Sequence, residues 1–187
     1  MIGSGIGNND RQNFQAWYVN ILESLYENRA AGIAVLMVST PLLERYLRQK
    51  NGRSPAQELD DACMTTLYQI FPALIDVATA RKFWNVYRNG FLHQATLNLE
   101  TRSGSALPPA ALTHDIPDAI RINSDVSFTL NPRHFSERIV SIIKGDFATF
   151  VGTGTAAPPM THVVAYVPAS TPGLIVPPIT LSTESRR

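Results

Sequence analysis

The sequence has almost no net charge and only one cysteine. Its 187 residues include 16 lysines and arginines and 15 aspartates and glutamates, which gives a formal net charge of +1. A chain this neutral has no overall field that would attract nucleic acid, so any contact with RNA or DNA must come from a local patch. A single cysteine excludes a disulfide within the chain and is typical of a reducing compartment. Because Cys63 lies in a helical pattern, we expect it to be buried rather than reactive.

Long apolar runs and a targeting segment are also lacking. The strongest apolar run covers residues 30–38, far short of the ~20 residues that a bilayer-spanning helix needs. The first residues are glycine-rich and polar, whereas a signal peptide is basic and then apolar. We therefore predict a soluble, cytoplasmic protein with no membrane partner.

The sequence contains no recognisable metal site. His114, His134 and His162 are scattered, without metal-ligand spacing to one another or to Cys63. The acidic cluster at residues 58–61 falls in an early helical turn, where negative charge suits the helix dipole. We therefore predict no metal ion and no other cofactor. No serine lies in a nucleophile elbow, although the sequence alone does not exclude a Ser-His-Asp arrangement.

Apolar residues at helical spacing are what the sequence has in abundance. It is 44% hydrophobic and 17% charged, which suits a globular core. Apolar side chains recur at steps of three and four residues, as on one face of a helix. They predict helices at residues 10–28, 30–50, 54–71, 73–98 and 131–150. Because short connections favour antiparallel neighbours, we expect a mainly all-α fold, a compact up-and-down bundle of four to five helices.

Prolines and small polar residues indicate where these helices begin and end. Pro41 should kink or divide the second helix, because proline lacks the amide proton of the helical ladder. Ser54 is expected to cap the third helix, with Gln57 as its capping-box partner. Asn131 should cap the last helix, with Pro132 at its first position.

The remaining segments do not have a helical pattern. Residues 119–130 alternate weakly between apolar and polar positions and predict a small two-stranded β-hairpin before the last helix. Residues 99–116 are rich in serine, glycine and proline and predict a loop. We therefore divide the chain into a flexible N-terminus at 1–9, a helical domain at 10–152 and a proline-rich, extended and poorly ordered tail at 153–187.

One predicted helix carries polar side chains that suggest chemistry. Aromatic residues recur every four positions from Phe83, and Arg88, Asn89 and His93 are set among them. Histidine, with an unperturbed pKa near ~6.5, can transfer a proton near neutrality, and the planar guanidinium of arginine suits phosphate. Together they are a minimal set for metal-independent RNA cleavage, in which the arginine stabilises charge on the phosphate. Asn89 can fix the imidazole tautomer, because residues four apart on a helix are neighbours.

A structural alternative stays open for these residues. On an ideal helix, at ~100° per residue, Arg88 and His93 point ~140° apart. They can act on one target if the long arginine side chain reaches round the helix, if the helix is distorted, which Gly90 makes easier, or if a two-fold dimer brings two copies together. In the alternative, Arg88 pairs with a carboxylate and His93 is a satisfied core residue. Spacing alone favours this alternative.

The run from Tyr87 to His93 resembles the signature of the HEPN domain superfamily, an arginine followed by four to six residues and a histidine. Asn89 matches the polar residue that often follows the arginine. The resemblance covers roughly residues 14–151, with the motif late in the helical order and a further helix behind it. It implies a helical bundle, usually a homodimer in which the two motifs meet, with Arg88 and His93 catalytic and Asn89 in support.

The resemblance also implies a class of function. Many HEPN proteins are metal-independent ribonucleases of host–virus conflict, toxin–antitoxin and RNA-processing systems, so RNA is the expected substrate and an antitoxin or another protein an expected partner. Some HEPN toxins have a tyrosine two residues after the histidine, and Ala95 at this position argues against that subgroup. Other members are inactive binding or dimerisation modules, and the balanced charge of this chain leaves that function open.

A group of cations suggests a site for phosphate. Arg45, Arg48, Lys50 and Arg53 lie at the end of the second predicted helix and in the turn behind it, where they can contact the phosphates of RNA. Cations in a last helical turn also complement the helix dipole. Of these two explanations for the cations, we favour the interaction with the helix dipole over contact with phosphate.

Overall fold

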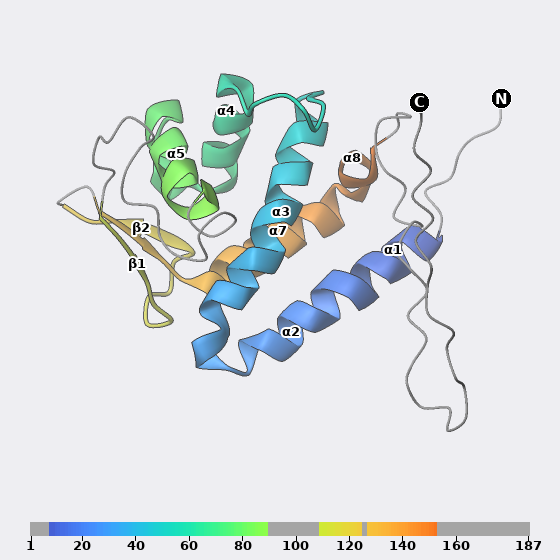
Figure 1. The fold of residues 1–187 in the computed structure, drawn as a ribbon, viewed down its shortest axis with the longest axis horizontal. Coiled ribbons are helices and arrows are strands. Elements are labelled where there is room, and N and C mark those ends of the chain that lie inside the picture. Colours follow the sequence, from blue (N-terminus) through green and yellow to red (C-terminus); the bar gives the residue numbers. More distant parts are fainter. Residues whose placement is uncertain (1–7, 90–108, 125–126, 153–187) are drawn as a thin grey trace, which may run out of the picture.

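The computed structural model describes residues 8–89, 109–124 and 127–152, which form a mainly helical fold with a small three-stranded sheet (Figure 1). Most of the predicted flexible N-terminus, the second part of the helix predicted at 73–98 and the predicted tail at 153–187 lie outside the described residues. The elements in chain order are α1 (Asn8–Phe14), the π-helical turn η1 (Gln15–Val19), α2 (Asn20–Tyr26), the 3₁₀ turn η2 (Arg29–Ala31), α3 (Gly32–Lys50), α4 (Asp61–Ile70), the 3₁₀ turn η3 (Pro72–Leu74), α5 (Val77–Trp84), the π-helical turn η4 (Asn85–Asn89), β1 (Ala110–Leu112), β2 (Ile120–Ile122), β3 (Phe128–Leu130), α7 (Pro132–Gly145) and α8 (Phe147–Val151).

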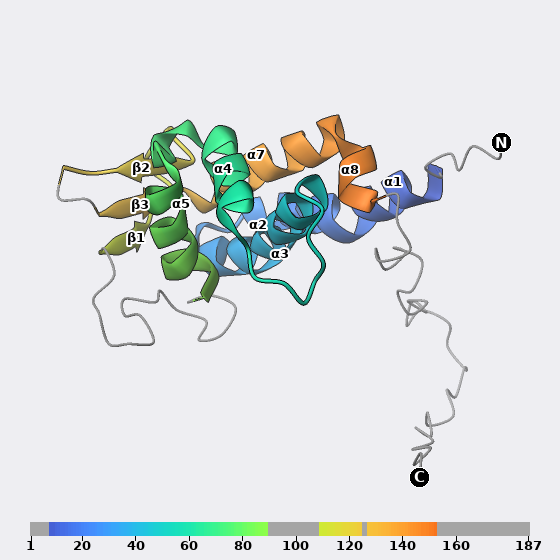
Figure 2. The same cartoon turned by 90° about the horizontal axis from the view of Figure 1, so that it is seen from above.

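Helix α3 is the element on which four of the other described helices pack. It contacts α2, α4, α7 and α8, and both views show it crossing the middle of the molecule (Figures 1 and 2). Its inner face includes Leu36, Leu43 and Leu47, each exposed by no more than 1%. By length and composition the segment Arg29–Lys50 could cross a membrane. Core helices of soluble proteins share these properties, and here the apolar inner face is buried against the neighbouring helices.

The predicted division of this helix at Pro41 does not occur. α3 is one helix with Pro41 inside it, and the proline lies on an exposed face. A proline removes one hydrogen bond of the ladder. The residues on either side, Thr40 and Leu42, are buried, so packing holds the helix together where the ladder is weakened.

Helix α4 begins later than predicted, and Asp60 rather than Ser54 is its cap. Asp60 Oδ1 accepts a hydrogen bond from the backbone N–H of Cys63 at 3.2 Å. Ser54 does form the predicted contact with Gln57, since its N–H donates to Gln57 Oε1 at 2.8 Å, but the chain there makes only a turn. The carbonyl of Ser54 accepts from the backbone N–H of Gln57 at 3.2 Å, as in a turn, and the carbonyls of both residues also accept from the Arg48 guanidinium. Cys63 is buried, as expected.

The turn before α5 carries backbone strain. Ile75 has a positive φ of 52°, and the N–H of Asp76 donates to the carbonyl of Leu74 at 2.6 Å. Ile75 is therefore the central residue of a positive-φ γ-turn, a rare and strained conformation. Asp76 then caps α5 by accepting a hydrogen bond from the N–H of Thr79 at 2.7 Å. The helix predicted from residue 73 thus begins only after this turn, at Val77.

The hairpin predicted at residues 119–130 is part of a larger sheet. β2 and β3 pair antiparallel, and β1 pairs parallel with the other edge of β3, so that the strand order is β1-β3-β2. The prediction missed β1, which lies within the predicted loop at 99–116, because three residues are too few to show the alternation of a strand. The sheet packs on the helices through Phe128, whose ring meets that of Phe83 edge-on at a centroid distance of 5.7 Å.

Helix α7 begins as predicted. Asn131 Oδ1 accepts hydrogen bonds from the backbone N–H groups of Arg133 and His134 at 3.1 and 3.3 Å, and Pro132 occupies the first helical position. The side-chain amide of Asn131 donates to the carbonyl of Ile116 at 2.8 Å. The cap therefore also holds the connection between β1 and β2 against the start of the helix.

Replacing Ile75 with glycine should stabilise the protein. Strain of this kind costs about 1–3 kcal/mol, and glycine adopts a positive φ without it. The Ile75 side chain is 71% exposed, so its removal loses little burial. After subtraction of the extra entropy of glycine in the unfolded chain, about 0.4–1 kcal/mol, we expect the free energy of unfolding in urea to rise by about 1 kcal/mol. Ile75→Ala keeps the Cβ and hence the strain, so it is the control and should not stabilise. Equal stability of wild type and the glycine variant would contradict the strain.

Candidate functional site

Arg88 lies in the π-helical turn that follows α5. Its neighbour Tyr87 is buried, and the Tyr87 hydroxyl donates to the carbonyl of Ala111 at 3.0 Å and also lies 3.2 Å from that of Phe128. Burial raises the pKa of Tyr87 above its ordinary value, so the phenol stays protonated and remains a donor. The contact with the sheet therefore fixes the backbone from which Arg88 projects.

The side chain of Arg88 contacts the carboxylate of Glu44 on α3. Arg88 Nε donates to Glu44 Oε2 at 2.9 Å, and Arg88 Nη2 donates to Oε1 at 3.4 Å. Two contacts along one edge of the guanidinium define the orientation of its plane. The Arg88 side chain is 25% exposed and that of Glu44 is 14% exposed. The pair is thus largely removed from water but still reaches the surface.

A second arginine holds the same carboxylate. Arg48, one turn further along α3, donates from Nη2 and Nε to Glu44 Oε1 at 2.7 and 3.1 Å. Arg48 Nη1 donates to the carbonyl of Ser54 at 3.0 Å and to that of Gln57. One carboxylate and two guanidinium groups therefore connect α3, the turn before α4 and the π-helical turn after α5.

The Glu44 carboxylate is ionised at neutral pH. Burial by itself raises the pKa of Glu44, but the hydrogen bonds and positive charges of Arg88 and Arg48 lower it by more, so the pKa lies below the ordinary value of glutamate. At neutral pH the Glu44 carboxylate therefore meets the guanidinium groups of Arg88 and Arg48 as an anion.

Two of the cations predicted to contact phosphate bind groups near the C-terminal end of the described chain. Arg45 donates from Nε and Nη2 to the backbone carbonyls of Phe150 and Val151 at 3.0 and 3.3 Å. These contacts satisfy carbonyls at the end of α8, which have no partner within the helix. Lys50 pairs with Asp146 at 2.8 Å, between α7 and α8. Both cations therefore attach the last helices to α3.

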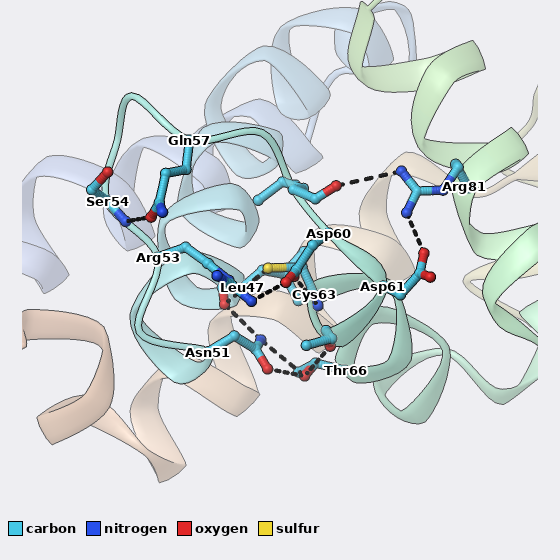
Figure 3. Close-up of polar contacts among 12 residues, drawn as sticks. Leu47, Asn51, Arg53, Ser54, Gln57, Asp60, Asp61, Cys63, Thr66 and Arg81 are labelled. Carbon is cyan, nitrogen blue, oxygen red and sulfur yellow. Dashed lines mark hydrogen bonds and ion pairs between the residues drawn. The ribbon is translucent and has the colours of Figure 1, made fainter.

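Arg53, another of these cations, belongs to the turn that precedes α4. It is directed at the carboxylate of Asp60, the cap residue of α4 (Figure 3). Of the four predicted phosphate ligands, Arg48 shares an acceptor with Arg88, the carboxylate of Glu44. Arg53 and the two cations near α8 donate to other groups. Contact between RNA and these four residues stays a prediction.

The other two residues of the predicted catalytic group are Asn89 and His93. Asn89 is the last residue of η4, and His93 lies outside the described residues. The proximity of His93 to Arg88 and the support by Asn89 therefore stay predictions. Arg88 has the carboxylate partner within its own chain that the structural alternative expects.

Glu44 is the residue of this site that sequence reasoning did not assign. Its spacing to Arg48, four residues on one helix, is a recognisable ion-pair signal. Its contact with Arg88 joins residues 44 positions apart, and it depends on how the chain after α5 lies against α3. No local pattern in the sequence could have indicated that partner.

Among the residues that the structure describes, no group of three or more His, Cys, Asp and Glu side chains is arranged to hold a metal ion. Comparisons with protein-family models, with curated proteins and with solved structures gave no match. The resemblance to HEPN domains therefore rests on the residues of the motif and on the helical order around it.

Replacing Glu44 with glutamine should destabilise the protein in a pH-dependent way. Glutamine keeps the shape but removes the charge, which takes an ionised carboxylate away from two largely buried guanidinium groups, and we expect a loss of about 2–3 kcal/mol at pH 7. The pKa of Glu44 is lower in the folded state than in the unfolded chain, where it is about 4.3. The stabilisation is therefore complete above the unfolded-state pKa and is lost as the pH falls through the folded-state pKa.

Urea denaturation of wild type and Glu44→Gln between neutral and acid pH measures this effect. The difference between the two proteins should shrink below about pH 4. Glu137→Gln is the matched control, because Glu137 also pairs with an arginine, at 2.8 Å, but is 41% exposed. We expect that control to cost less than about 1 kcal/mol. A difference for Glu44→Gln that did not change with pH would contradict the ionised pair.

Proposed function

We propose that this chain is a metal-independent endoribonuclease of the HEPN type. In the proposed reaction the 2′-oxygen of a ribose attacks the neighbouring phosphorus, and the bond to the 5′-oxygen breaks. The 2′-hydroxyl loses a proton and the leaving 5′-oxygen gains one; His93 carries out one of these transfers, and solvent water supplies or accepts the other proton. Arg88 stabilises the negative charge that grows on the phosphate, and Asn89 supports His93. The products are a 2′,3′-cyclic phosphate and a 5′-hydroxyl.

The setting of Arg88 is the observation that supports this function most. Its guanidinium is oriented by a carboxylate and remains 25% exposed, and it projects from a π-helical turn. Such turns within helices are frequent at functional sites. On an ideal helix Arg88 and His93 would point ~140° apart. The π turn at Asn85–Asn89 departs from that ideal geometry at Arg88, and apposition of two copies in a dimer is the other way to bring the two groups to one target.

The proposal includes an assembly and a biological setting. We infer a compact up-and-down bundle of four to five helices that pairs as a homodimer, so that the two motifs meet at the interface. RNA is the substrate, no cofactor is required, and Arg45, Arg48, Lys50 and Arg53 are the proposed contacts with its phosphates. The setting is a toxin-like or defence system in the cytoplasm, with an antitoxin or another protein as partner.

A second candidate function is a non-catalytic HEPN-like module that binds a nucleotide or a protein. The contacts of the four predicted phosphate ligands favour it, because each of these cations donates to a carboxylate or a backbone carbonyl of the protein. A ribonuclease has to neutralise the phosphates of its substrate with such cations. A module that binds another protein has no such requirement.

Cleavage of RNA in the presence of EDTA tests the proposed function. We expect the purified protein to cleave a labelled single-stranded RNA and to leave 2′,3′-cyclic phosphate ends. Arg88→Ala and His93→Ala should each lower the rate by about 100-fold or more, the contribution typical of a positioned acid–base or charge-stabilising group.

Two further variants control for the loss of an ordinary arginine or histidine. Arg121 pairs with Asp118 on the surface at 3.0 Å, and His134 lies beside Glu137 at 3.1 Å. Arg121→Ala and His134→Ala should cleave like wild type. Absence of cleavage over varied RNAs by a folded dimer would contradict the ribonuclease and favour the binding module, for which a pull-down of protein partners is the next measurement.

A further inference from the structure

The carboxylate of Glu44 lies where it can set the direction of the Arg88 guanidinium. We propose that Glu44 is a positioning residue for the cleavage reaction: it does not touch the RNA, but it fixes the plane of the guanidinium that stabilises the scissile phosphate. The inference rests on the proposed function, because it is that function which gives Arg88 a phosphate to stabilise.

The side chains of Arg88 and Glu44 are in contact at two points. An arginine side chain carries about 2 kcal/mol of rotamer entropy, so an unrestrained guanidinium would sample many directions. Glu44 Oε2 accepts a hydrogen bond from Arg88 Nε at 2.9 Å, and Glu44 Oε1 accepts one from Arg88 Nη2 at 3.4 Å. Charge-stabilising groups accelerate a reaction most when they are aimed before the transition state forms. A guanidinium that is already oriented meets this condition.

Glu44 is itself held in place. It directly follows Leu43 on α3. Because Leu43 is only 1% exposed, the backbone of Glu44 belongs to the core helix. Arg48 donates two hydrogen bonds to the same carboxylate. It also donates to the carbonyls of Ser54 and Gln57 in the turn before α4. Glu44 therefore links the orientation of the Arg88 side chain to α3, whose inner face is buried in the core.

The opposite role for Glu44 would be that of a competitor, a carboxylate that occupies the guanidinium until phosphate displaces it. Such a competitor has to leave when the substrate arrives. Departure of Glu44 would also remove the anion from Arg48, whose side chain is only 13% exposed, and would leave a buried charge unpaired. The contacts therefore favour positioning. The two roles predict opposite effects of removing the charge, so one experiment separates them.

Steady-state cleavage of single-stranded RNA in EDTA by the full-length chain is the test. Glu44→Gln should lower kcat by about 10- to 100-fold, the effect of a misaligned catalytic group, with little change in KM, because the substrate-binding groups remain. Glu44→Asp keeps the charge but shortens the side chain, so its kcat should lie between those of wild type and Glu44→Gln. Glu137→Gln, which removes a carboxylate from a surface ion pair, should leave both parameters unchanged. Circular dichroism shows that each variant is folded at the assay temperature, and Glu44→Asp decides if Glu44→Gln is not.

Chemical rescue distinguishes positioning from general support of the fold. Formate, added to a Glu44→Ala variant, should restore part of kcat, whereas chloride at the same ionic strength should not. Unchanged kcat in a folded Glu44→Gln or Glu44→Asp variant, or a higher kcat, overturns the positioning role while wild-type cleavage lost in Arg88→Ala still supports the ribonuclease. No cleavage by wild type overturns the ribonuclease and this inference together.

Discussion

Burial of the inner face of α3 is the constraint on which the rest of the structure depends. A fully buried leucine side chain contributes about 1.5–3 kcal/mol, and Leu36, Leu43 and Leu47 are all buried on this one face. The helix rotation that points Leu43 and Leu47 inward also sets the direction of the residue that follows each of them. Glu44 and Arg48, each one residue further along, therefore come to the border between core and surface, with side chains 14% and 13% exposed. The charged cluster is thus placed by the same packing that forms the core.

Side-chain caps mark where α4, α5 and α7 begin, and they show which boundaries could be predicted. Asn131 was predicted as a cap because Asn-Pro precedes a clear apolar stripe, and it caps α7. Ser54 has the same local signals but does not start a helix, and the carbonyls of Ser54 and Gln57 accept hydrogen bonds from the Arg48 guanidinium. Those contacts come from another element, so the local sequence does not contain them. The mainly helical class was predictable from periodicity, whereas these boundaries depended on tertiary contacts.

The candidate site divides in the same way between local and distant information. Arg88 could be singled out as a candidate site residue, because its place among aromatic residues and beside Asn89 is a local pattern, and its chemical role stays a prediction. Its orientation was not, because that depends on Glu44, which is 44 positions away. Strand β1 shows a similar limit, since its three residues acquire a partner only when β3 lies beside them. Periodicity therefore predicts which segments are helical, and packing decides which polar groups meet.

The charged cluster of Glu44, Arg48 and Arg88 contributes differently to the stability of the fold and to the orientation of the Arg88 side chain. Removing charges from water costs several kcal/mol for each ion, and replacing a buried ion pair by apolar residues is often neutral or stabilising. Stability alone therefore gives no reason to place a carboxylate and two guanidinium groups at the edge of the core. What apolar residues could not supply is direction, because hydrogen bonds along one edge of a guanidinium define its plane. An arginine that is held in a defined direction and remains a quarter exposed is suited to an anion that approaches from solvent.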